Sequence, residues 1–323
     1  MTRFLTRHSW SLGLFAILVI LLVATRIIQP NFGASGLDSL ARAALPFAFA
    51  TIGMGIVVIA GGIDLSVASI MAVAGVIAAL LMQQMGDASA GLVVLIVLLA
   101  GVTMGAINGL LIVLTRVPDI VVTLAMLFVW EGVALLILNA PGGTAAPWLR
   151  ALVVGGVTIP GLPPELTAWL PRAFVVLVAF TLIIWLPLRR SKLGLSIYAI
   201  GSDQNAAFRS GVPIGLTRVA AYAFAGLFAA LGGLSITLST GIGEPIAGPY
   251  LLASVAAVVL GGISLTGGRG GLLGPIIAVF ILRTLRLDLT LLSVDPNVTT
   301  IIEGIIMVAV VMIGGLLAMR GPR

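Results

Sequence analysis

Between Ala43 and Gly86 the sequence carries a single charged residue, Asp64, in an otherwise apolar run. A helix needs about 20 apolar residues to cross the hydrocarbon core of a bilayer, so this run is long enough for two crossings. In the whole chain 60% of the residues are hydrophobic and 9% are charged, whereas a soluble domain carries about 25% charged residues. The apolar runs also lack the period-two alternation of an outer-membrane barrel. The sequence therefore predicts an all-α polytopic membrane protein.

Hydropathy predicts about ten transmembrane helices. They are expected at residues 11–28, 39–60, 63–85, 91–114, 118–139, 173–188, 214–238, 249–263, 272–287 and 298–319. Little chain remains outside these spans, and no stretch is long or polar enough for a nucleotide-hydrolysing module. Residues 1–323 are therefore expected to form one transmembrane domain.

The segment from Gly61 to Ser66 brings a carboxylate and two adjacent glycines into the apolar run. A charge at membrane depth is costly, so it is usually satisfied by partners, faces water or serves a passage. The glycines favour a broken or re-entrant helix, which a membrane tolerates where protein or a cavity covers the freed backbone, and such breaks mark transport pathways. The alternative is a short turn between two ordinary spans, with Asp64 capping the second helix. The sequence leaves both interpretations open.

A second segment of the chain is similar to this one. Residues 58–66 are Val-Ile-Ala-Gly-Gly-Ile-Asp-Leu-Ser, and residues 258–266 are Val-Val-Leu-Gly-Gly-Ile-Ser-Leu-Thr. Internal repeats are common in transporters, but the predicted topology puts both copies on the same side of the membrane. They therefore do not form an inverted repeat if the span count is right, and chance convergence on a tight Gly-Gly turn is the alternative.

Acidic side chains at membrane depth are few. Besides Asp64 they are Glu131, near the middle of the fifth predicted span, and Glu303, near the start of the last. Such acids could form a proton relay, but none has a Lys, Arg or His within its own span. Glu303 is expected to stay hydrated near the outer interface, so Asp64 is the first candidate for a pathway residue and Glu131 the second.

Three glycines four residues apart predict close helix packing in the fourth span. Gly101, Gly105 and Gly109 share one face of a helix, and small residues at this spacing let a second backbone approach closely in a membrane. Asn108 borders this face and is expected to hydrogen-bond across it. The candidate residues for a translocation path or helix break are Gly61, Gly62, Asp64, Ser66, Asn108 and Glu131.

The distribution of Lys and Arg predicts the orientation. With both termini in the cytoplasm, the majority of the 17 Lys and Arg residues lie inside, as is typical of cytoplasmic loops. The outer connection, about 139–172, is rich in Pro and Gly. It carries Trp148 and Trp169, which are expected to anchor at the membrane interface or to form a docking surface for an external partner.

The inner connection, about 189–213, is the more polar of the two. Its core begins at Asp203, continues with small helix-forming residues and stops at Gly211, which are start and stop signals of a helix. The sequence therefore predicts a short amphipathic helix on the cytoplasmic face, from Asp203 to Ser210.

Four segments resemble one known family. The motifs at 61–66, 105–109, 199–211 and 260–270 are similar, in order and spacing, to those of the ribose/monosaccharide-type ABC transporter permeases, and the resemblance covers nearly the whole chain. One departure concerns the inner helix, where the family commonly has Asn-x-Glu-Ala-Ala and this chain has Asp-Gln-Asn-Ala-Ala at 203–207. A specific carboxylate contact at Asn205 is therefore not implied.

The resemblance implies a set of partners. The family pairs two permease subunits, as a homo- or heterodimer, with a cytoplasmic ATP-binding subunit and a periplasmic sugar-binding protein in the bacterial inner membrane. By this likeness the inner helix docks into the ATP-binding subunit. The residues implied for ATPase coupling are Gly201, Asp203, Asn205, Ala206, Ala207, Arg209 and Gly211.

The function expected is that of a non-catalytic permease subunit of an ATP-driven importer for a small sugar or polyol. A neutral solute needs hydrogen-bonding groups more than charges, which agrees with the scarcity of ionised residues. Two alternatives remain at this point, a proton-coupled secondary transporter that uses Asp64 and Glu131, and a scaffold subunit without a path of its own. No cofactor or metal is expected, since the chain has no Cys and a single His, and no nucleic acid is expected, since the basic residues are scattered at span ends.

Overall fold

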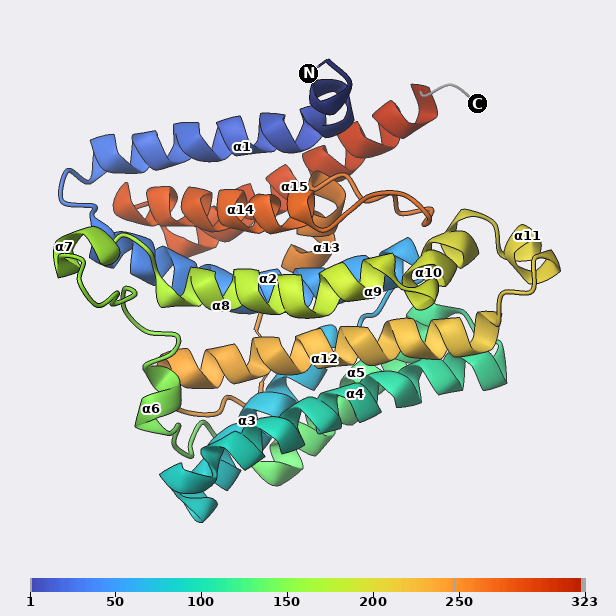
Figure 1. Cartoon of the computed structure of the whole chain (residues 1–323), viewed down its shortest axis with the longest axis horizontal. Helices are drawn as coiled ribbons and strands as arrows, with labels where there is room; N and C mark the ends of the chain where they lie inside the picture. Colours follow the sequence, from blue (N-terminus) through green and yellow to red (C-terminus); the bar gives the residue numbers. More distant parts are fainter. Residues whose placement is uncertain (1, 247, 321–323) are drawn as a thin grey trace.

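The computed structural model describes residues 2–246 and 248–320, which form a bundle of helices without a β-strand (Figure 1). The long helices are α1 (Thr2–Ile28), α2 (Ala34–Ile59), α3 (Val67–Met85), α4 (Ala90–Thr115), α5 (Asp119–Ile137), α12 (Ile214–Thr240), α14 (Leu273–Leu291) and α15 (Pro296–Arg320). One further helical run consists of α8 (Arg172–Phe180), the π-helical turn η2 (Thr181–Trp185) and α9 (Leu186–Arg190). The short helices are η1 (Asp87–Ser89), α6 (Pro147–Arg150), α7 (Pro164–Thr167), α10 (Lys192–Ser202), α11 (Gln204–Arg209) and α13 (Tyr250–Leu260).

Among the described residues, seven helical segments are long and apolar enough to cross a membrane. They are α1 from Trp10, α2, α3, η1 with α4, α5, the run α8–η2–α9, and α12. The prediction of an all-α polytopic membrane protein is confirmed, but the count of about ten spans is not. The 11 residues of α13 extend about 16 Å at 1.5 Å per residue, half of a hydrocarbon core of about 30 Å. Residues 249–263 therefore do not form the full crossing that hydropathy predicts.

Helix α2 forms the centre of the bundle. Every residue from Ala44 to Ile59 is buried, and α2 packs against α12, α14, α13 and α8. Helix α12 lies between α2, α3 and α4. Because α2 is surrounded by protein, a polar group at its end is shielded from lipid.

The glycine face of α4 packs against α12, as the spacing predicts. A Cβ at Gly105 would collide with the carbonyl oxygen of Tyr222, and one at Gly101 would collide with the carbonyl oxygen of Gly226. Lipid provides no hydrophobic driving force between helices, so close backbone packing is what stabilises such a pair. The close packing of α4 on α12 therefore depends on glycines in both helices.

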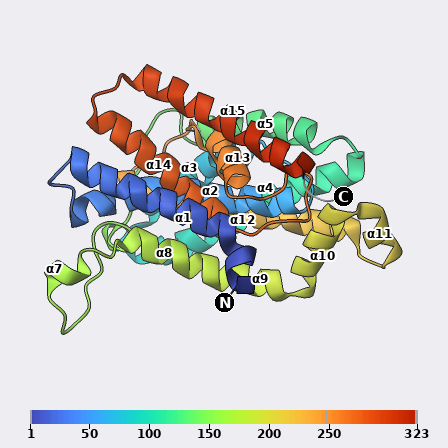
Figure 2. The ribbon, with the colours of Figure 1, turned by 90° about the horizontal axis from the view of Figure 1, so that it is seen from above.

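The bundle has two distinct ends (Figures 1 and 2). Helices α10 and α11 lie at one end, on the right of Figure 1, and α6 and α7 lie at the other. Two contacts of α1 agree with this arrangement, because Trp10 bonds the carbonyl of Leu260 and Thr25 bonds Asp288. These are called the α11 end and the α7 end below.

The chain turns back into the bundle after α12. Helix α12 ends at the α7 end, where the guanidinium of Arg150 bonds the carbonyl of Leu238. The segment 241–246 then returns along α3, and two backbone hydrogen bonds of 3.1 and 2.8 Å join Gly243 to Gly142 of the connection after α5. Helix α13 begins within the bundle and ends at the α11 end. The re-entrant element of this protein is therefore the segment before α13 together with α13.

Candidate translocation and coupling sites

The segment 60–66 is a tight turn between α2 and α3. Gly61 adopts a left-handed conformation with φ +84°, which glycine reaches at little cost. The amide of Gly62 bonds the carbonyl of Val57 at 3.0 Å, and the amide of Gly61 bonds that of Val58 at 2.9 Å. This is the Schellman ending of a helix. The glycines therefore end α2, and the break lies between two long helices instead of within one.

The turn also buries polar side chains, which an ordinary surface turn does not: Gly61 is exposed, but Asp64 and Ser66 are buried. The side chain of Asp64 is fully buried. Its Oδ1 accepts hydrogen bonds from the amide of Ser66 at 2.9 Å and from the hydroxyl of Ser66 at 2.6 Å. Its Oδ2 has no hydrogen-bond partner among the described residues. Asp64 thus bonds Ser66, the residue before α3, inside the protein, but it accepts from no amide within α3 and is not the helix cap that one interpretation expects.

Of the other predicted residues, Ser66 and Asn108 lie beside Asp64, and Glu131 does not. Asn108 of α4 donates to the hydroxyl of Ser66 at 2.6 Å, and Trp130 of α5 donates to the side-chain oxygen of Asn108 at 3.2 Å. Glu131, in contrast, makes no hydrogen bond or ion pair in the described part of the chain and is partly exposed. The structure brings together Asp64, Ser66 and Asn108, and it leaves Glu131 apart from them.

A second polar cluster, which the sequence analysis missed, supports the same turn. The hydroxyl of Tyr222 donates to Oδ2 of Asp119 at 3.0 Å and lies 3.4 Å from the carbonyl oxygen of Ile63. The hydroxyl of Thr123 lies 3.3 Å from that same oxygen. Arg218 lies 3.7 Å from Asp119. Asp119 is at the start of α5 and Tyr222 is in α12, so their sequence positions give no signal of this contact.

The inner connection contains two helices where the sequence predicts one. Helix α10 begins after Ser191, whose hydroxyl accepts from the amide of Gly194 at 3.1 Å. Helix α11 begins after Asp203, whose Oδ1 accepts from the amides of Asn205 and Ala206 at 2.8 and 2.9 Å. The predicted short helix is confirmed, with the expected cap. Helix α10 was missed because its apolar residues alternate with glycine and serine.

The surface of α11 corrects one expectation. Asp203, Asn205, Ala206 and Arg209 are exposed, as a docking helix requires. Ala207, however, is only 5% exposed and packs against the protein core. Phe208 is 70% exposed, and an aromatic side chain at that exposure on a polar helix is a feature that the sequence analysis did not single out. Gly211 follows with φ +79° and ends the helix.

Three backbones meet where α10 ends. The amide of Gly268 donates to the carbonyl of Ile59 at 2.9 Å, and a Cβ at Gly201 would collide with that same carbonyl. Only glycine at 201 lets α10 approach the end of α2 this closely. The hydroxyl of Tyr198 donates to the carbonyl of Gly270 at 2.9 Å, and burial raises the pKa of this tyrosine. The inner connection is therefore in direct contact with the 60–66 turn.

The two similar segments end their helices in the same way. Helix α13 closes with an amide bond from Ile263 to the carbonyl of Val258 at 3.1 Å, and Gly262 adopts φ +85°. The structural match pairs Gly61 with Gly262, one residue away from the sequence match. Both turns lie at the α11 end, so the similarity reflects two equivalent helix endings on one side of the bundle.

An ion-pair cluster joins α14 and α15. Glu303 is buried and lies 3.3 Å from Arg283 and 3.1 Å from Arg286. The guanidinium of Arg283 also lies 4.0 Å from the ring centre of Phe47 in α2. The expectation that Glu303 is a hydrated acid near the interface is wrong. Its partners are on a neighbouring helix, which inspection of its own span does not detect.

The comparisons with known proteins decide the family. A model of the family described as "Branched-chain amino acid transport system / permease component" matches residues 36–311. The chain belongs to this permease family. The "Autoinducer 2 import system permease protein LsrD" of Escherichia coli O9:H4 and that of Shigella flexneri are each 30% identical to this permease over 95% of its length and 92% of theirs. The LsrD protein of Escherichia coli O157:H7 is 29% identical over the same shares. No solved structure gives a significant match.

Membership of the family settles the class of function. This permease is a non-catalytic, multi-pass subunit of an ATP-driven import system of the inner membrane, and the family implies ATP-binding and substrate-binding partner components. The similarity to ribose/monosaccharide-type permeases that the motifs indicate is thereby confirmed at the level of the family. The permease interpretation is supported over a proton-coupled secondary transporter.

Proposed function

We propose that this chain lines the translocation path of an importer for a small sugar or polyol and transmits the movements of a cytoplasmic ATP-binding subunit through α11. It would act with a second permease subunit, in a homo- or heterodimer, and with a periplasmic binding protein. Autoinducer 2, which the LsrD relatives import by name, is the first solute to test, and D-ribose is the second.

The orientation follows from the inner connection. The α11 end carries α10 and α11 of the connection 189–213, and the excess of Lys and Arg favours the cytoplasm for that end. The α7 end, with the connection 139–172, would then face the periplasm and the binding protein. Residues 1–323 would form one domain with these two specialised connections.

The observation that carries the coupling proposal is a chain of polar contacts from α11 to the buried turn. Oε1 of Gln204 in α11 accepts from Arg218 at 3.3 Å, and Arg218 pairs with Asp119 at 3.7 Å. Asp119 in turn accepts from Tyr222, whose hydroxyl lies beside the carbonyl oxygen of Ile63. A displacement of α11 would therefore act on the residue next to Asp64 through side chains already in contact.

A second route reaches the same turn through the backbone. Gly201, at the end of α10, packs against Ile59 and the loop at Gly268. Since α11 follows α10 directly, a rigid movement of the inner connection would displace both contacts together. Packed contacts of this kind can carry energetic coupling, provided that they change between two arrangements.

The proposal is tested by reconstitution of the complete transporter in lipid vesicles. The expected result is ATP-dependent uptake of autoinducer 2 or D-ribose, with ATP hydrolysis stimulated by the loaded binding protein. Arg218→Gln should uncouple ATP hydrolysis from solute uptake, so that hydrolysis continues while uptake falls. Thr115→Val serves as the control, because Thr115 is an exposed residue at the last position of α4 and takes no part in these contacts. Uptake that persists without ATP, or that Arg218→Gln leaves unchanged, would contradict the proposal.

A further inference from the structure

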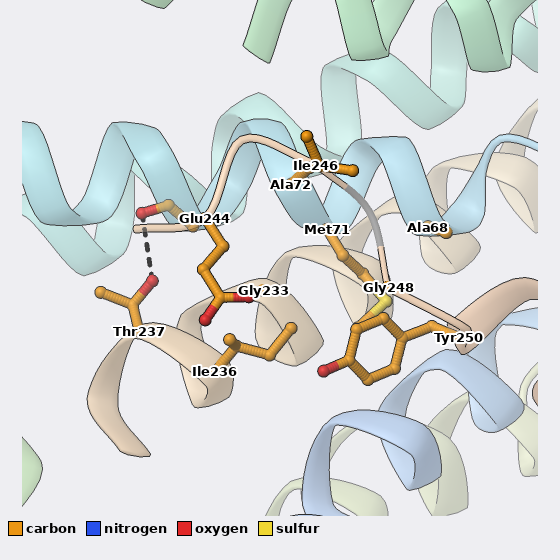
Figure 3. A pocket seen from close by; sticks show the side chains of 11 residues that line it. Ala68, Met71, Ala72, Gly233, Ile236, Thr237, Glu244, Ile246, Gly248 and Tyr250 are labelled. Carbon is orange, nitrogen blue, oxygen red and sulfur yellow. Dashed lines mark hydrogen bonds between the residues drawn. The ribbon is translucent and has the colours of Figure 1, made fainter. Parts of the chain in front are cut away.

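A small hollow lies between α3, α12 and the re-entrant segment (Figure 3). Its walls include Met71 of α3, Thr237 of α12, and Glu244 and Tyr250 from the returning chain. The free space is about 10 Å³, which is room for about one water molecule. In Figure 3 the carboxylate of Glu244 and the hydroxyl of Tyr250 point toward the same space beside Ile236.

The hollow lies deep within the bundle, away from both ends of α3. A Cβ placed on Gly243 would lie 3.0 Å from the carbonyl oxygen of Gly75, so the returning chain touches α3 at that level. At 1.5 Å per residue, Gly75 is about 12 Å from Val67 at one end of α3 and about 15 Å from Met85 at the other. Glu244 follows Gly243 directly and therefore lies at membrane depth.

Glu244 is an exposed carboxylate at this depth. It makes no hydrogen bond or ion pair in the described part of the chain, and Ile246, two residues further on, is an exposed apolar residue. A charged side chain at membrane depth faces a water-filled space or protein, because contact with lipid is costly. The face that carries Glu244 is therefore not a lipid-facing surface.

The charges around the hollow indicate the class of solute. Tyr250 interacts electrostatically with both Glu244 and Arg283, and Arg283 belongs to the cluster with Arg286 and Glu303. Glu244 is the one charged side chain among the residues that line the hollow, and the cluster of Arg283, Arg286 and Glu303 behind it carries a net charge of +1 that balances it. A lone carboxylate accepts hydrogen bonds from two neighbouring hydroxyl groups, and charge-assisted bonds of this kind are stronger than neutral ones.

The tyrosine supplies the apolar part of such a site. The ring of Tyr250 lies 4.5 Å from the ring of Phe47, centre to centre, and Arg283 packs on Phe47 as well. The ring is thus supported from behind while its hydroxyl reaches the hollow. A few polar groups on an apolar wall, as here, are typical of sites that orient a small ligand.

We infer that Glu244 and Tyr250 form a solute contact point of the translocation path, selective for a neutral compound with adjacent hydroxyl groups. Glu244 accepts hydrogen bonds from two hydroxyls, and Tyr250 presents its ring to the apolar face of the solute. Binding here is weak and transient, because conduction requires release as well as entry. This inference rests on the proposed function and adds the residues and the chemistry of selection.

The first experiment tests the location without any transport assay. The chain has no Cys, so Glu244→Cys introduces a single thiol into the complete transporter in right-side-out vesicles. A charged, membrane-impermeant thiosulfonate should label it, because a thiolate forms only where water reaches it. Ile183→Cys is the control, since Ile183 is 70% exposed in the middle of the run α8–η2–α9 and should stay unlabelled. Equal and negligible labelling of the two thiols would overturn the inference, whether or not the transporter works.

The second experiment tests the chemistry with autoinducer 2 and D-ribose as probes. Glu244→Ala should raise the KM for uptake about tenfold, the loss expected for one hydrogen bond to a charged group. Glu244→Gln, which keeps an acceptor oxygen, should raise it less than threefold. Uptake is normalised to the amount of assembled transporter. A KM that neither variant changes would show that Glu244 does not contact the solute, and the inference would be wrong.

Discussion

The side-chain amide of Asn108 donates a hydrogen bond of 2.6 Å to the hydroxyl of Ser66, which ties the middle of α4 to the first residue before α3. Both residues are fully buried. Asn108 also accepts from Trp130 of α5, so one amide links three helices around the turn that contains Asp64. Buried polar groups of this kind are costly when a partner is removed.

Asn108→Leu should therefore destabilise the bundle. The variant leaves the ring nitrogen of Trp130 and the hydroxyl of Ser66 each short of a partner, at about 1–3 kcal/mol for a buried group left unsatisfied. The midpoint of thermal unfolding in detergent should fall. Thr103→Val is the control on the same helix, because the Thr103 hydroxyl is exposed and bonds only the carbonyl of Leu99. Equal midpoints for the two variants would contradict the role given to Asn108.

Asp64→Asn should be tolerated better than Asp64→Leu. The Asn side chain keeps an acceptor for the amide and hydroxyl of Ser66, whereas Leu leaves both donors unpaired. The measurement is ATP-dependent uptake, normalised to the amount of assembled transporter. Equal loss of uptake in two normally assembled variants would indicate that the proton of Asp64, and not its hydrogen bonds, is what transport needs.

Gly105→Ala should weaken the packing of α4 on α12. Its new methyl group would collide with the carbonyl oxygen of Tyr222, so the two helices would have to separate. Gly132→Ala in α5 is the matched control, because nothing lies within 4 Å of a Cβ at that position. Thermal unfolding should show a clear loss for Gly105→Ala and little change, or a small gain from reduced backbone freedom, for Gly132→Ala. The opposite order would exclude the glycine packing as a source of stability.

Much of this architecture could be predicted from local sequence. The apolar runs give the class of fold, the glycine spacing of α4 gives close helix packing, and Asp203 with Gly211 gives the bounds of α11. Each of these depends on residues close together in the chain. The Asp203 cap, the Gly211 stop and the glycine spacing of α4 all act through local backbone geometry, so they can be recognised from the sequence alone.

The features that the sequence did not reveal depend on contacts between distant helices. Tyr222 and Asp119 are 103 positions apart, and the arginine partners of Glu303 are in a different helix. The half-length of α13 was missed for another reason. Hydropathy does not distinguish an apolar helix from an apolar turn, so α13 and the first residues of the turn after it were counted as one crossing at 249–263.

The orientation can be tested by thiol labelling of intact cells. Ser202→Cys, at the exposed end of α10, should be unreactive toward an impermeant reagent added outside. Leu162→Cys, in the connection at the α7 end and 51% exposed, should react. Gly143 is less suitable for the outer thiol, because it adopts φ +77° and a Cβ there would lie 2.7 Å from Ala79. Labelling of Ser202→Cys from outside would refute the proposed topology.

Phe208 should be the main apolar anchor of α11 on the ATP-binding subunit. It is an exposed aromatic side chain on a short capped helix, and buried aromatic anchors of interfaces often contribute about 2 kcal/mol or more. Phe208→Ala should therefore weaken association with the purified ATP-binding subunit roughly 30-fold, with unchanged amounts of permease in the membrane. Leu166→Ala is the control, because Leu166 is similarly exposed at 68% but lies at the α7 end.

Ala206→Glu should have the same effect as Phe208→Ala, because Ala206 is exposed on α11 and a bulky charge there would obstruct a close-packed socket. Ala207→Glu should behave differently. Ala207 is buried against the permease itself, so the glutamate would be forced into an apolar environment and would lower the stability of the permease as well as its coupling. Thermal unfolding of the isolated permease separates the two effects. Full ATP-dependent uptake in both Phe208→Ala and Ala206→Glu would show that α11 does not contact the ATP-binding subunit.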